Sequence, residues 1–184
     1  MGNRMRQQVN PDQITFTLLS EDELEWARQL HNDPEVLKML TDPHEVNPEE
    51  QIAWFQNLKK SKSSQRWVIW YQGIKIGIAR LDQIDSCNKN ICIGLDIHKD
   101  HRGKGLAKPI YRELFKYWFE TQEFNRIWLI TASYNIRARN LYTGLGFLYE
   151  GCYRESLFKD ERYYDCILMG LLKKEYLLLK EGNK

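Results

Sequence analysis

A glycine-rich turn near the middle of the chain combines residue types that bind a phosphate. Gly103, Gly105 and Ala107 are small, so a ligand can approach the backbone closely there. Arg102 and Lys104 add positive charge. The turn leads into a segment of helical periodicity, and the first N–H groups of a helix have no partner inside it and lie at the positive end of its dipole. This arrangement predicts an anion site, for which a pyrophosphate is the natural occupant.

The spacing of these glycines excludes two common nucleotide-binding motifs. A P-loop requires four residues between its first glycine and a Gly-Lys pair, and a dinucleotide-binding turn requires GxGxxG. Residues 97–107 contain neither pattern. A short Gly-rich turn is by itself more often structural than phosphate-binding, so a functional interpretation needs a second motif.

The second motif follows about thirty residues later, after a predicted strand. Together the two motifs resemble the GNAT superfamily, whose members are acetyl-CoA-dependent N-acetyltransferases. The matching positions are Arg102, Gly105 and Ala107, then Asn135, Ala138, Leu141, Tyr142, Leu145, Gly146 and Phe147, then Glu150, Gly151 and Arg154. The resemblance covers about residues 21–172. It is closest to the branch of ribosomal-protein N-terminal, spermidine and bacterial amino-sugar acetyltransferases.

The resemblance implies how the cosubstrate, acetyl-CoA, is held. The backbone N–H groups from Arg102 to Ala107 would bind the CoA pyrophosphate, and the strand at Leu95–Ile97 would pair its backbone with the pantetheine arm. Asn135 would hydrogen-bond that arm. The residues assigned to the cosubstrate in this way are Leu95, Ile97, Arg102, Gly103, Lys104, Gly105, Leu106, Ala107, Asn135, Arg139 and Tyr142.

Two residues of the second motif also have a structural interpretation. Asn135 can cap the helix that follows it, and this does not exclude a contact with the cosubstrate. Tyr142 lies about two helical turns further along. It is either a core aromatic residue on an amphipathic helix or the group beside the thioester sulfur, and the surrounding motif favours the second role.

The resemblance further implies direct attack of a neutral amine on the thioester, with no covalent enzyme intermediate. Tyr142 would then protonate the departing thiolate. Many relatives have a glutamate where this chain has Cys92, so the general base does not carry over. Asp96 lies on the same predicted strand face as Cys92 and is our candidate for a second catalytic residue. Asp82 and Asp85, at the end of the preceding strand, are the alternatives, acting directly or through a water.

The acceptor amine is less well defined. We expect a small molecule such as a nucleotide-linked amino sugar, because aromatic residues gather where the acceptor would lie. These residues are Trp54, Trp67, Trp70, Tyr149 and Tyr153. A protein N-terminal acetyltransferase and a polyamine acetyltransferase are the alternatives within the family. The alternative from another class is a non-catalytic CoA-binding module, which the missing glutamate at Cys92 motivates.

These residues need a scaffold, and its elements are visible as periodic segments. Capping residues at Ser20 and Asn47 predict a helix after each. Alternating apolar residues predict a hairpin around Gln72-Gly73. Further strands are expected over 91–97, 126–132, 147–154 and 162–171, and further helices over 104–121 and 136–143.

This order of elements predicts a single mixed α/β domain. The resemblance specifies a largely antiparallel central sheet with helices on both faces and a CoA cleft between the two central strands. We expect the N-acetyltransferase domain over residues 14–175, between a polar N-terminal tail at 1–13 and a C-terminal tail at 176–184.

The composition is that of an ordinary globular protein, with 42% hydrophobic and 28% charged residues among 184. A net charge of +2 is too small to imply a nucleic-acid partner. No apolar window reaches the roughly 18 residues of a membrane span, and the first residues lack the apolar core of a signal peptide. We therefore expect a cytoplasmic monomer or homodimer. No His, Cys and carboxylate cluster has metal-ligand spacing, so no metal is expected.

Overall fold

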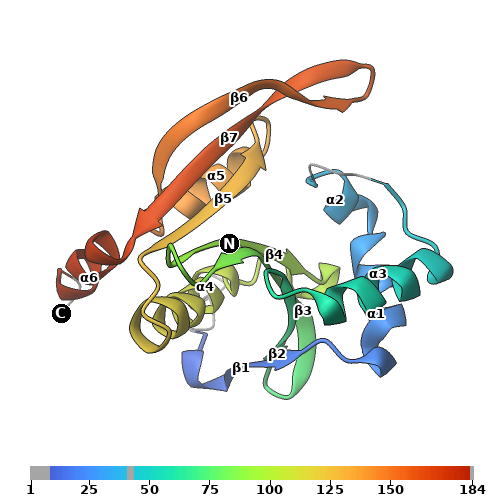
Figure 1. Cartoon of the computed structure of the whole chain (residues 1–184), viewed down its shortest axis with the longest axis horizontal. Coiled ribbons are helices and arrows are strands. Elements are labelled where there is room, and N and C mark those ends of the chain that lie inside the picture. Colours follow the sequence, from blue (N-terminus) through green and yellow to red (C-terminus); the bar gives the residue numbers. More distant parts are fainter. Residues whose placement is uncertain (1–8, 41–43, 183–184) are drawn as a thin grey trace, which may run out of the picture.

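Seven strands form one continuous sheet with helices packed around it, in a computed structural model that describes residues 9–40 and 44–182 (Figure 1). The strands are β1 (Ile14–Leu18), β2 (Gln65–Tyr71), β3 (Ile74–Asp85), β4 (Asn90–Ile97), β5 (Arg126–Ala132), β6 (Leu148–Lys159) and β7 (Arg162–Leu172). The helices are α1 (Leu24–His31), α2 (Pro34–Leu37), α3 (Pro48–Lys60), α4 (Ala107–Phe115), α5 (Ile136–Thr143) and α6 (Lys173–Glu181).

The two central strands of the sheet are held together over only part of their length. The strand order is β1-β2-β3-β4-β5-β7-β6, and every neighbouring pair is antiparallel except β4 and β5. The parallel ladder joins residues 90–92 to residues 126–128 and then ends. Beyond it, β4 stays paired with β3 and β5 with β7. The structure therefore confirms a largely antiparallel sheet that is open between its central strands.

Local sequence signals account for where several elements begin. Ser20 with Glu23 and Asn47 with Glu50 form capping boxes, as predicted. The β2–β3 hairpin turns at Gln72-Gly73, where both residues have positive φ. That backbone conformation is the one that a tight hairpin turn requires.

Each face of the sheet has its own hydrophobic cluster. On one face, the apolar side of α4 packs against Ile91 and Ile93 of β4. On the other, α1, α2 and α3 pack against Val68 of β2 and Ile78 of β3. Burying one such side chain contributes about 1.5–3 kcal/mol. Figure 1 shows α1–α3 gathered at one end of the molecule, while β6 and β7 project as a long hairpin.

The helix predicted over residues 104–121 starts later and is less regular than expected. Gly103 and Gly105 have φ of +75° and +81°, so the chain is still in a turn there, and α4 begins at Ala107. After Phe115 the helix continues as a wider π-helical segment, Lys116–Thr121. Pro109 is the third residue of α4, where its missing N–H leaves no gap in the helical hydrogen bonds.

Two elements were not expected from the sequence. β1 is the outer strand next to β2, and α6 follows β7 directly. The expected boundary at residue 175 falls inside α6. Tyr176, the first residue of the expected tail, stacks on Phe119 at 5.1 Å between ring centroids and meets the Phe115 ring edge-on at 6.0 Å. Its hydroxyl donates to Glu120.

We expect that α6 contributes to the stability of the domain. Tyr176→Ala removes both ring contacts and should lower the free energy of unfolding by about 2 kcal/mol. Leu178→Ala, on the same helix but 68% exposed, is the matched control and should change it by less than about 0.5 kcal/mol. Urea unfolding of the two variants measures the difference. Equal stabilities would show that the domain ends before α6.

Candidate active site

The turn between β4 and α4 has the open geometry that an anion site needs. A short 3-10 helix, Lys99–His101, leads out of β4, and Gly103 and Gly105 then turn the chain into α4. A Cβ atom placed on either glycine would meet nothing within 4 Å. The backbone is therefore accessible, and Lys104 between the glycines is exposed. Leu106, the residue before α4, is buried and anchors the turn.

Leu95 and Ile97 lie on the part of β4 beyond its ladder with β5. Their side chains are half-buried and pack against the α4-side cluster, while the backbone of β4 faces the opening. An extended arm could lie along this edge and reach the turn at its end. The opening and the turn therefore fit the pantetheine and pyrophosphate parts of CoA.

Arg102 was expected to add charge to the anion site, but its side chain turns back into the protein. Its Nε donates to the carbonyl oxygen of Ile97 at 2.7 Å, and its Nη1 lies 3.2 Å from Oδ1 of Asp33. The guanidinium thus connects the turn to the start of α2. Only the backbone of Arg102 is placed to serve the predicted site.

At the start of α5, the structure shows the capping role of Asn135. Its side-chain oxygen accepts a hydrogen bond from the Ala138 N–H at 3.1 Å. A cap uses the oxygen and not the NH2 group, so a second contact stays a prediction. Arg139 donates to the Ser133 carbonyl at 3.1 Å. It also lines, with Tyr149, a separate hollow of about 380 Å³ between α5 and the β6–β7 pair.

Tyr142 lies on α5 with its ring half-buried against the α4-side cluster. The ring meets Tyr111 edge-on at 5.9 Å and Phe147 at 5.8 Å. Burial raises the pKa of the Tyr142 hydroxyl, although the nearby Tyr111 hydroxyl and the Arg80 guanidinium act in the opposite direction. The pKa of Tyr142 therefore lies above the ordinary value of a tyrosine, and the hydroxyl keeps its proton throughout the neutral range. Tyr142 is both a packed aromatic residue and a protonated hydroxyl near charged groups.

The opposite face of the β3–β4 pair carries a partly buried ion pair. Arg80 of β3 lies over Gly94 of β4, and its Nε is 3.0 Å from Oδ2 of Asp96. A Cβ on Gly94 would come within 2.8 Å of the guanidinium, so a side chain there would displace it. Cys92, on the same face, has its thiol pKa raised to about 11 by burial. Cys92 is therefore a neutral thiol and a poor nucleophile at neutral pH.

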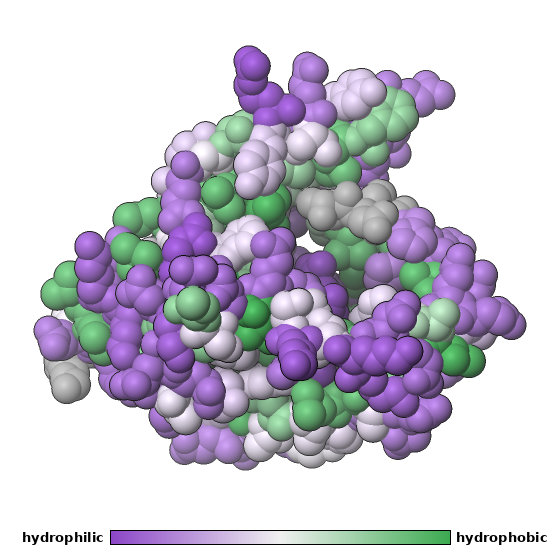
Figure 2. All heavy atoms as spheres, in the orientation of Figure 1, coloured by the Kyte–Doolittle hydropathy of each residue, from purple (hydrophilic) through white to green (hydrophobic). Residues whose placement is uncertain are grey.

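This ion pair lies on the floor of a cavity of about 410 Å³ between the sheet and α1–α3. The cavity is lined by Ala27, Leu30, His31, Leu40, His44, Val46, Glu50, Gln51, Trp54, Arg66, Ile78, Arg80 and Asp96. Figure 2 shows the surface hollowed between the β6–β7 hairpin and the α1–α3 layer. Tyr142 lies close enough to Arg80 and Asp96 for their charges to act on the pKa of its hydroxyl.

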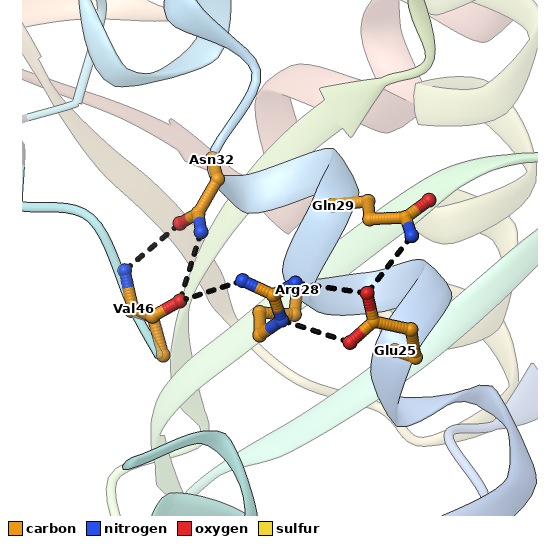
Figure 3. A network of polar contacts seen from close by, with 5 residues as sticks. All are labelled: Glu25, Arg28, Gln29, Asn32 and Val46. Atoms are coloured by element: carbon orange, nitrogen blue, oxygen red, sulfur yellow. Dashed lines mark hydrogen bonds and ion pairs between the residues drawn. The ribbon is translucent and has the colours of Figure 1, made fainter. Parts of the chain in front are cut away.

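A polar network fixes the wall of the cavity opposite the sheet (Figure 3). Asn32, after α1, exchanges two hydrogen bonds with the backbone of Val46, at 2.8 and 2.9 Å. Arg28 donates to the same carbonyl at 3.1 Å and is held by Glu25. Gln29 supports Glu25 in turn. The network joins α1 to the segment that leads into α3, although the chain between them is long.

The structure brings together only some of the expected acceptor-side residues. Trp54 lines the cavity, whereas Trp67 packs on Trp118 on the α4 side and Trp70 donates to Thr17. Asp82 pairs with Arg66 at 2.8 Å, and Asp85 accepts from Asn88 in the β3–β4 turn. Tyr153 is exposed on β6.

Arg80 is the site residue that sequence reasoning missed. Its neighbours in β3, Ala79 and Leu81, are buried in the α4-side cluster. Because side chains alternate along a strand, Arg80 faces the opposite side of the sheet, as Ile78 does. That alternation was visible in the sequence. Its pairing with Asp96 was not visible in the sequence, because that pairing depends on the register between β3 and β4.

Residues 9–40 and 44–182 contain neither a metal-binding cluster nor a membrane-spanning helix. No three His, Cys, Asp or Glu side chains come close enough to hold a metal ion. None of the helices described there has the length and apolar character needed to cross a membrane.

Comparisons with known proteins agree with this geometry. A family model described as the acetyltransferase (GNAT) domain matches residues 13–148. A putative ribosomal N-acetyltransferase of Bacillus subtilis is 34% identical over 114 residues, which are 62% of this chain and 60% of that protein. The spermidine N(1)-acetyltransferase of Vibrio cholerae is 26% identical over 90% of this chain and 96% of its own length.

A solved structure of the Vibrio cholerae enzyme, in complex with CoA and spermine, superposes with a TM-score of 0.83. It covers 90% of this chain and 99% of that one, at 26% identity. The matched family model spans most of the chain and includes both motifs and both central strands. The chain therefore belongs to the GNAT acetyltransferases, as an enzyme that uses acetyl-CoA to acetylate an amine.

Proposed function

We propose that the acceptor is a small aliphatic polyamine, bound in the cavity between the sheet and α1–α3. The observation that carries this proposal is the charge of the cavity. Its two arginines, Arg66 and Arg80, already pair with Asp82 and Asp96, whereas no cation pairs with Glu50 within the described part of the chain. Arg66 and Arg80 are therefore each matched by a carboxylate, Asp82 lying beside the lining and Asp96 in it, and the Glu50 carboxylate is the charge left over at the cavity. A polyamine, with several ammonium groups, complements it.

The same pairing argues against the nucleotide-linked amino sugar expected from the sequence. The diphosphate of such an acceptor would need unpaired cations or helix N-termini around it. Arg66 and Arg80 would have to leave their carboxylates, and a buried charge without its partner is costly. The likeness to spermidine acetyltransferases over most of both chains supports the polyamine independently.

Acetyl-CoA supplies the acetyl group and the thiolate leaving group. The chain's own residues must bind the amine, remove one proton from its nitrogen as it attacks the carbonyl carbon, and return a proton to sulfur as the C–S bond breaks. In our proposal Asp96, oriented by Arg80, receives the amine proton directly or through a water. Tyr142 donates the other proton, since its raised pKa keeps the hydroxyl protonated.

The turn before α4 is proposed to hold the pyrophosphate. Gly105→Val would place a branched side chain in the open space above the backbone and strain a residue at φ +81°. We expect acetyl-CoA affinity to fall by at least about tenfold, or ~1.4 kcal/mol. Gly73→Val is the matched control, because Gly73 has φ +75° and open space too, but lies in the β2–β3 turn. Calorimetry showing equal losses in both variants would refute the assignment.

Tyr142→Phe keeps the ring and its packing and removes only the hydroxyl. If Tyr142 is the general acid, the chemical step should slow by at least about 10²-fold, while acetyl-CoA affinity and melting temperature stay near those of the unmodified protein. Single-turnover kinetics beside a melting curve separates this from a packing role. A variant that turns over at the original rate would mean that water protonates the thiolate.

The acceptor class is tested by Glu50→Gln. Glutamine still completes the capping box with Asn47, so the helix start is kept and only the charge is lost. With spermidine as acceptor we expect KM to rise about two- to fivefold, the range for an exposed ion pair, with kcat nearly constant. Glu49→Gln, one residue earlier and outside the cavity lining, is the control.

Three further acceptors decide between the candidate functions. Release of free CoA is followed with spermidine, a nucleotide-linked amino sugar and a peptide with a free N-terminus. We expect turnover with spermidine alone. Turnover with either other acceptor and not with spermidine would overturn the polyamine proposal, and acetyl-CoA binding without turnover of any of them would favour a non-catalytic module.

A further inference from the structure

An ion pair links the cosubstrate turn to a different part of the chain. Arg102 Nη1 lies 3.2 Å from Asp33 Oδ1, and the two residues are 69 positions apart. Both side chains are largely buried, with 22% and 15% of their surface exposed. The Arg102 Nε bond to the Ile97 carbonyl fixes the guanidinium at the end of β4. The pair is therefore a firm connection between the turn and α2.

Asp33 has a second role at the same atom. Its Oδ1 accepts the Glu35 N–H at 2.9 Å and so caps α2. Burial raises the pKa of the Asp33 carboxyl, but the hydrogen bonds from Arg102 and the α2 backbone outweigh it and leave the pKa below its usual range. Asp33 is therefore charged throughout the neutral range.

The other end of α2 is held by two residues from the second half of the chain. The carbonyl of Lys38 accepts the Tyr134 hydroxyl at 2.9 Å and Lys159 Nζ at 2.7 Å. Tyr134 lies just before α5, and Lys159 is the last residue of β6. The segment from Asp33 to Lys38 thus rests on three elements from the second half of the chain.

The chain directly after this segment borders the acceptor cavity. Val36 and Leu40 are buried in the cluster that joins α1–α3 to the sheet, and Leu40 lines the cavity. Of the contacts that hold α2 described above, the Arg102–Asp33 pair is the one made by a residue of the turn itself. A shift of the turn when CoA binds would be passed to this wall through the pair.

We propose that Asp33 and Arg102 are positioning residues that couple CoA binding at the turn to the acceptor wall formed by α1 and by Leu40, which follows α2. Through the pair, a turn that CoA has ordered also orders the α2 segment, so the acceptor cavity is completed only when the cosubstrate is in place. By linkage, an acceptor that binds the ordered wall tightens CoA by the same factor. The inference rests on CoA binding at this turn, which is part of the proposed function.

Asp33→Asn separates the ion pair from the cap. Asparagine caps a helix as well as aspartate does, so α2 should keep its N-terminus while the charge is lost. Amide hydrogen exchange over residues 24–40 is measured with and without CoA. In the unmodified protein we expect CoA to slow exchange at least about fivefold, the low end of common coupling between sites. In Asp33→Asn that slowing should be lost, with calorimetric CoA affinity within about threefold of normal.

Arg102→Lys is a second variant, because a lysine keeps the charge but cannot reach the Ile97 carbonyl and Asp33 together. It should lose the slowing too. Glu120→Gln, which breaks the remote pair with Lys180, is the matched control and should keep it. Slowing that survives in both Asp33→Asn and Arg102→Lys overturns the coupling, as does its absence in an unmodified protein that binds CoA. A protein that does not bind CoA at all contradicts the proposed function itself.

Discussion

The parting of β4 and β5 after three paired residues is the constraint on which the rest of the structure depends. Two adjacent parallel strands normally satisfy each other's backbone groups along their whole length. Here the facing edges are left open, and a ligand with an extended polar arm can pair with them. The turn after β4 lies at one end of the opening, so in our proposal one feature of the sheet determines where the cosubstrate binds.

The two faces of β4 have different roles, because one packs in the core and the other faces the site. Ile91 and Ile93 pack against α4 and keep the strand in place, while Asp96, on the other face, lines the cavity. Gly94 is also on that face, beneath the Arg80 guanidinium, which a side chain at this position would displace. An ion pair on the cavity floor costs desolvation, and in our proposal it is kept because it orients the Asp96 carboxylate toward the amine.

The acceptor side is assembled from separate parts of the chain and held by polar contacts. The Arg28, Asn32 and Val46 network fixes one wall, and the Arg102–Asp33 pair fixes α2 against the cosubstrate turn (Figure 3). Such contacts are easily changed without disturbing the apolar clusters.

The sequence by itself determined most of the elements and the family, and it predicted the residues on the cosubstrate side of the site. Alternation placed β3, β4 and β5, capping residues placed α1 and α3, and two motifs pointed to the CoA turn and to Tyr142, because all of these signals are local along the chain. It did not show β1 or α6, whose stability comes from pairing with β2 and from stacking on α4. Only the tertiary structure decided that Arg102 binds Asp33, that Arg80 binds Asp96, and which aromatic residues reach the cavity. These contacts depend on strand register and on the packing of distant segments, which no local pattern records.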